Sequence, residues 1–77
     1  MRSAEYETWH LHDAGGGLLR LKVRYRNDAE VPAWRDGPDW PEAVARAEAA
    51  GWEVYDCEPG DAPGEYAILH LKRAAPG

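Results

Sequence analysis

The sequence predicts an α+β domain in which two β-hairpins flank one helix. This order, ββαββ, gives a four-stranded antiparallel-type sheet with the helix packed on one face. Two observations lead to this prediction. Apolar and polar residues alternate, as in strands, over the segments 6–12, 19–26, 52–57 and 65–73. Between the second and third segments, residues 40–50 instead place apolar side chains along one helical stripe.

The first two strands are expected to pair as an antiparallel hairpin, because Gly15-Gly16-Gly17 between them tolerates the positive φ of a tight turn. In the second strand, apolar and basic residues occupy opposite faces: Leu19, Leu21, Val23 and Tyr25 on one, and Arg20, Lys22, Arg24 and Arg26 on the other. The apolar face is expected to lie under the helix. The basic stripe makes this strand a plausible sheet edge, since charges discourage pairing with other chains.

The helix has both a start and a stop signal. Asp39 can cap free backbone N–H groups, Pro41 is tolerated in the first turn, and Gly51 provides the C′ stop. The stripe predicted to face the sheet is mostly alanine: Trp40, Ala43, Val44, Ala47 and Ala50. A helix of this kind can lie close to a sheet but contributes little apolar area.

Residues 27–38 form the longest irregular segment and contain Trp34. A loop of this length in a small domain is often functional or packed down by its own side chains. Trp34 is therefore predicted to cover the core or a sheet edge, with contact to a ligand as the alternative.

The third strand is apolar on both faces, so its orientation stays open. Either Trp52 and Val54 or Tyr55 and Cys57 face the helix. As a strand residue, Cys57 is expected to be a small buried hydrophobe. It is the only cysteine, which excludes a disulfide within the chain.

The second half of the chain resembles a short bacterial family known as domain of unknown function 4177. The resemblance is carried by residues 43–51 followed by Gly51-Trp52-Glu53, and by the last strand, which ends in Lys72-Arg73. It implies a compact ββαββ-like module of no assigned activity, and no catalytic residues come with it. The Arg-rich second strand and the Trp34 loop depart from the family pattern.

Length and charge narrow the function classes. Seventy-seven residues make one domain, with a core over about 5–73 and with ends, 1–4 and 74–77, that should fray. A net charge of −5 argues against nucleic acid as a partner, because phosphate contact needs a basic field. With neither a run of about 18 apolar residues nor a signal-peptide pattern, no membrane association is expected, and the expected location is the cytoplasm.

The three histidines are the residues whose pattern most suggests a binding site. His10 and His12 share one face of the first strand, and His70 lies on the last strand. If these strands are neighbours, the imidazoles could converge as a metal or small-ligand site. The alternative is that they are polar residues on the uncovered face of a sheet, and no metal or other cofactor is predicted.

Self-association is the preferred function. A chain of this size has a marginal core and usually needs a further source of stability. This favours a homodimer or another protein partner. The acids that balance the basic stripe are expected from Asp56, Glu58 or a second subunit. The interface candidates lie on the sheet face opposite the helix and in the loop: Tyr6, Arg20, Lys22, Arg24, Trp34, Tyr66 and Ile68.

An enzyme is not predicted. Outside tyrosine, Ser3 and Thr8 are the only hydroxyl nucleophiles, and Cys57 has no histidine close to it in sequence. The triple glycine lacks the Gly-Lys-Ser/Thr ending of a phosphate loop.

Overall fold

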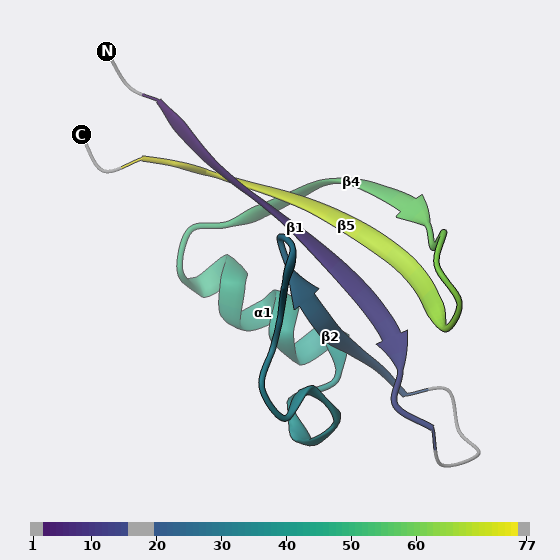
Figure 1. Ribbon diagram of the computed structural model, residues 1–77. Helices are drawn as coiled ribbons and strands as arrows, with labels where there is room; N and C mark the ends of the chain where they lie inside the picture. The colour runs from purple at the N-terminus through teal and green to yellow at the C-terminus, as the bar shows by residue number, and fades with distance from the viewer. Residues whose placement is uncertain (1–2, 16–19, 76–77) are drawn as a thin grey trace.

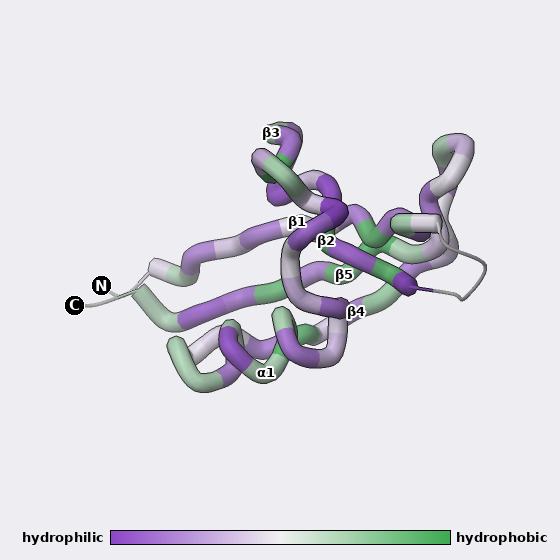
Figure 2. The backbone as a smooth tube through the Cα atoms, turned by 90° about the horizontal axis from the view of Figure 1, so that it is seen from below, coloured by the Kyte–Doolittle hydropathy of each residue, from purple (hydrophilic) through white to green (hydrophobic). Residues whose placement is uncertain are grey.

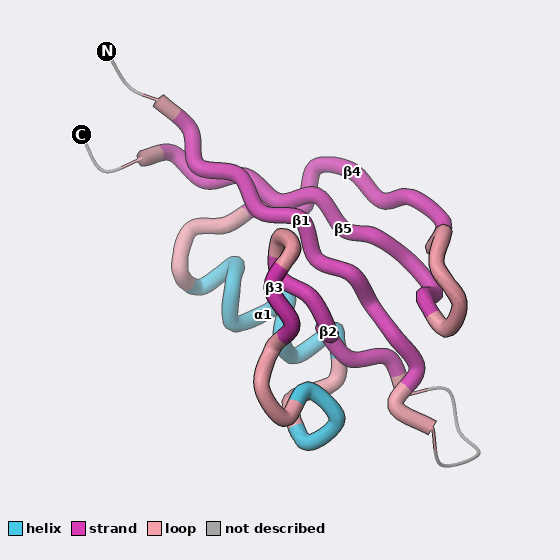
Figure 3. Tube along the Cα trace, in the orientation of Figure 1, coloured by secondary structure: helices cyan, strands magenta, loops and turns pink. Residues whose placement is uncertain are grey.

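The computed structural model describes residues 3–15 and 20–75. A five-stranded antiparallel sheet has the strand order β3-β2-β1-β5-β4, and one α-helix lies against one of its faces (Figures 1 and 3). The elements are β1 (Ala4–Asp13), β2 (Leu21–Arg26), β3 (Ala29–Glu30), the 3₁₀ turn η1 (Trp34–Asp36), α1 (Trp40–Ala49), β4 (Glu53–Pro59) and β5 (Glu65–Ala74). The predicted α+β class is confirmed, but the prediction of four strands is wrong by one.

The additional strand, β3, lies within the segment that was predicted to be irregular. Asn27 adopts a positive φ of 56°, which asparagine tolerates well, and the chain turns back so that Glu30 pairs with Tyr25. Farther along β2, an isolated bridge joins Lys22 to Asp39. The prediction of β2 as a sheet edge is therefore wrong, since its outer side is covered by these two pairings.

The long strands β1 and β5 form the centre of the sheet. They pair from Ala4 with Ala74 to His12 with Glu65, so the described ends of the chain lie side by side (Figure 1). Ala4 and Ala74, which were expected to fray, are paired in the sheet. Leu19 and part of the predicted glycine turn lie outside the described residues.

The core lies between the sheet and α1. Its buried residues all come from strands: Trp9, Leu11, Leu21, Leu69 and Leu71. From the helix, Ala43, Val44 and Ala47 pack against this cluster, but no helix residue is fully buried. In Figure 2, α1 lies beside the strands as a separate layer, with hydrophobic and hydrophilic residues alternating along the chain. The alanine-rich stripe thus covers the sheet with little side-chain volume.

The helix boundaries follow the sequence signals with one difference. Gly51 has a φ of +92° just beyond the helix, as its C′ position requires. Asp39 is the N-cap residue, yet its carboxylate makes no capping hydrogen bond. It binds Lys22 instead, with 2.7 Å between Oδ1 and Nζ.

Bulges decide which side chains face the helix. Leu11 pairs with Val23 and His10 with Tyr25, which leaves Arg24 as an extra residue and reverses the alternation. Tyr25 was predicted on the helix side. Its ring instead lies edge-on to His10 and His12 on the opposite face.

A second bulge orients β4 and resolves its two apolar faces. Trp52 and Val54 pack against the core, whereas Tyr55 and Cys57 are exposed. The prediction of a buried Cys57 is wrong because β4 is an edge strand, and the core packing does not reach this residue.

Candidate functional site

The sheet face opposite α1 carries exposed aromatic side chains, and we call it the open face. Its described members include Tyr6, Thr8, His10, Tyr55, Ile68, His70 and Lys72. Tyr6 is 63% exposed and Tyr55 is 48% exposed, although their rings meet edge-on at 6.2 Å. Tyr55 also lies 6.2 Å from the His70 ring and 5.4 Å from Lys72 Nζ. These contacts make a continuous aromatic surface across three strands that no element of the described chain covers.

The histidines share this face but do not converge. His10 Nδ1 lies 2.9 Å from Glu65 Oε2, and His12 Nε2 lies 3.5 Å from the same oxygen. His70 instead contacts Glu58 on β4. Within residues 3–15 and 20–75, no group of three histidine, cysteine or acidic side chains is arranged to hold a metal ion. The geometry gives no support to a metal site built on His10, His12 and His70.

Burial and hydrogen bonds act on the charge states of the His12–Glu65 pair. His12 is buried, and this burial, together with the nearby Arg24 cation, holds the pKa of its imidazole below the usual value although Glu65 acts in the other direction. For Glu65, burial opposes ionisation. Hydrogen bonds from the Asp61 backbone N–H and from His10 outweigh that effect and lower the pKa of the carboxyl. A neutral His12 beside a carboxylate is the resulting arrangement near neutral pH.

The predicted basic stripe is divided among separate acidic partners. Lys22 is buried, and its ammonium group donates to the Gly37 carbonyl at 2.7 Å as well as binding Asp39. The other cations pair elsewhere: Arg24 with Glu30 and Arg26 with Glu7. For these three cations, the acids come from β1, β3 and the helix start, and not from Asp56 or Glu58.

The other interface candidates differ in accessibility. Tyr66 is 57% exposed and Arg20 is exposed, while Ile68 and Arg24 are half-buried. Trp34 is buried and has the Arg35 guanidinium 4.4 Å from its ring centre. It covers the outer side of β2, as predicted for a lid. Sequence reasoning missed Tyr55, because its orientation depends on a bulge that alternation alone does not reveal.

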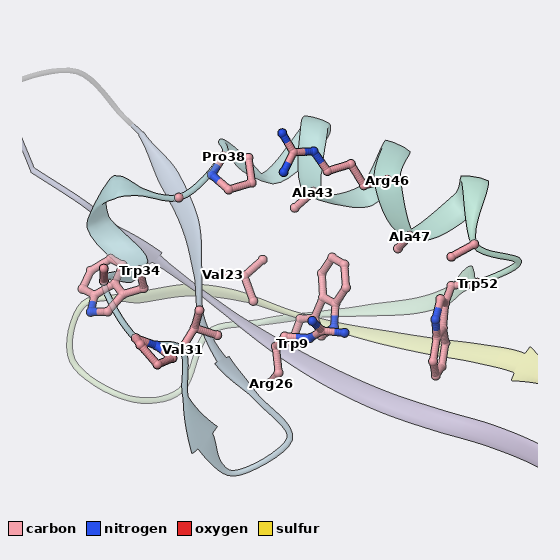
Figure 4. A pocket seen from close by; sticks show the side chains of 14 residues that line it. Trp9, Val23, Arg26, Val31, Trp34, Pro38, Ala43, Arg46, Ala47 and Trp52 are labelled. Carbon is pink, nitrogen blue, oxygen red and sulfur yellow. The ribbon is translucent and has the colours of Figure 1, made fainter.

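A groove opens on the other side of the sheet, between α1, β2 and the segment 31–38. Its volume is about 360 Å³. Figure 4 shows Trp34 toward one end and Trp52 toward the other, with Trp9 between them and the helix residues Ala43 and Ala47 opposite. The only sequence feature that relates to this groove is the alanine stripe of the helix. That stripe predicts a helix lying close to the sheet, not a groove beside it.

No protein-family model, curated protein or solved structure matches this chain. The resemblance to domain of unknown function 4177 therefore stays a prediction. Among the residues that the structure describes, no helix has the length and apolar character that a membrane crossing requires.

Proposed function

We propose that this protein is a non-enzymatic interaction module that forms a homodimer through its open face. The observation that carries the proposal is the exposure of Tyr6 and Tyr55, in contact with each other on a sheet face that the described residues leave uncovered and that also carries Ile68. Tyrosine is enriched in protein interfaces, since its ring buries apolar area while its hydroxyl keeps a hydrogen-bond partner.

The small core supports self-association. Five buried residues form the core cluster, and the helix has none, so this domain buries little apolar area for its length. Covering the open face with a second copy would add a second apolar layer. A homodimer supplies that layer through a two-fold arrangement in which the same residues meet from both subunits.

The charges of the open face suit a specific contact better than a nonspecific one. Lys72 and the His70–Glu58 pair lie among the tyrosines, so the surface is aromatic but not purely apolar. Polar groups at the border of an aromatic patch limit indiscriminate association and fix the alignment of two copies. We propose the cytoplasm as the location, in keeping with the lone cysteine.

Two variants test the interface. We expect Tyr6→Glu and Tyr55→Glu each to weaken the dimer about tenfold or more, because each introduces a carboxylate that association would bury without a partner. Size-exclusion chromatography with light scattering at about 10 and 100 μM measures the effect. Both side chains are exposed in the monomer, so folding, checked by circular dichroism, should be kept.

The matched control is Ala45→Glu, which places the same charge on an exposed helix position across the sheet. It should leave the mass distribution unchanged. A wild-type chain that dimerises while both tyrosine variants associate equally well would contradict the choice of face.

A further inference from the structure

We infer that the groove beside α1 is a binding site for a small planar aromatic carboxylate. It lies on the side of the sheet opposite to the dimer face proposed above, so the two proposals are independent. The volume of about 360 Å³ lies within the range of small-molecule sites.

The walls of the groove favour a flat apolar ligand. Three of the four tryptophans of the chain line it, namely Trp9, Trp34 and Trp52, whereas Trp40 does not. The helix and its C-cap contribute only Ala43, Ala47 and Ala50 in addition to Arg46. Figure 4 shows Ala43 and Ala47 on the helix side of Trp9, where they pack against the core with little side-chain volume. Trp9 and Trp34 are buried and form the floor of the groove, so a planar ring would lie edge-on to them and against the half-buried Trp52.

The charges that line the groove select an anion. Arg26 and Arg46 contribute guanidinium groups, and no acidic side chain is among the described residues that form the walls. Arg26 is already engaged, since its Nε and Nη2 both donate to Glu7 while its guanidinium lies 5.5 Å from the Trp9 ring centre. Arg26 therefore shapes the wall and is not free to bind a ligand.

Arg46 is the cation that can turn to a carboxylate. Its side chain is 68% exposed, and it is paired with Glu42 one helical turn away at 3.1 Å. An exposed pair of this type contributes little to stability, so exchange of Glu42 for a ligand carboxylate costs little. In Figure 4 the Arg46 side chain runs along the helix toward Pro38, on the side of the groove where Trp34 lies.

The test uses 2-naphthoate as the probe and 2-naphthamide as its neutral counterpart. Titration is followed by the indole N–H signals in ¹⁵N–¹H NMR spectra of the ¹⁵N-labelled full chain. We expect 2-naphthoate to shift the signals of Trp9, Trp34 and Trp52, with Trp40 as the internal control that stays in place. The amide should bind several-fold more weakly.

Arg46→Gln tests the role of the cation. This exposed substitution should weaken 2-naphthoate binding about threefold to tenfold and leave 2-naphthamide binding unchanged. Equal affinity for the two probes, or an unchanged naphthoate affinity in Arg46→Gln, would overturn the choice of a carboxylate. Absence of indole shifts at millimolar probe would overturn the site. Indole signals of Trp9 and Trp52 that move with protein concentration alone would assign the groove to a second copy and also overturn the proposal.

Discussion

The buried side chain of Lys22 holds the loop that covers the outer side of β2. Lys22 is buried and binds both Asp39 and the Gly37 carbonyl, which ties the start of α1 to the sheet. The alternation of the sequence placed Lys22 on an exposed stripe. It could not show that the chain returns over this strand, because that contact joins residues far apart in sequence. Which group pairs with a buried charge depends on the tertiary fold.

Asp39→Asn should lower stability near neutral pH, because it leaves the buried Lys22 ammonium without an anionic partner. The hydrogen bond from Lys22 lowers the pKa of Asp39. Its contribution is therefore present above the ordinary carboxyl range of about 4 and is lost as the pH falls through the lowered folded value. Melting temperatures at pH 7 and pH 3 check this: the difference from wild type should shrink at pH 3. Asp36→Asn, an exposed carboxylate in the same segment, is the control, and an equal effect of the two variants would contradict the account.

His12 makes stability depend on pH in the same direction but in a higher pH range. Its pKa is lowered, so protonation is easier in the unfolded chain than in the folded one. Stability should therefore fall as the pH drops below about 6.5, the ordinary value for histidine. Urea unfolding between pH 7 and pH 5 should give a steeper loss for wild type than for His12→Gln. The charged or titratable groups around it, Arg24, His10 and Glu65, are present in both proteins, so parallel curves would contradict a buried neutral His12.

Among the elements, the helix packs with little burial, since none of its residues is fully buried. Its boundaries could be predicted from Pro41 and Gly51, since caps are local signals. The four long strands could likewise be predicted from alternation, whereas the two-residue β3 could not. The side of the sheet on which a strand residue lies could be predicted only up to the next bulge. Tyr25 is an example, because the bulge before it reverses the alternation and leaves no clear mark in the sequence.

Ala47→Leu should stabilise the domain by about 0.5–2 kcal/mol, because Ala47 is half-buried and the added methylene groups extend over the apolar wall of the groove. Ala45→Leu adds the same group on the exposed side of the helix and should change the free energy of unfolding by less than about 0.5 kcal/mol. Urea denaturation compares the two. A loss of stability in Ala47→Leu would mean that the groove is too shallow to accept a larger side chain.

At the scale of the whole molecule, the chain is an elongated body of 47 × 23 × 19 Å with two unlike surfaces. One side of the sheet carries the helix and the groove, and the other is the open face. The sequence predicted that the alanine-rich helix contributes little apolar area. It correctly indicated Tyr6 and Ile68 for the open face. It could not predict Tyr55 there, because that position depends on the bulge in β4, nor the separation of the histidines, which depends on the register between β1 and β5.

A homodimer joined through the open face makes the average mass in solution depend on concentration. Sedimentation equilibrium of the wild-type chain between about 1 and 200 μM measures this dependence. We expect an average mass that rises from 8.6 kDa toward twice that value and then levels off. A mass that stays at that of the single chain over the whole range would contradict it.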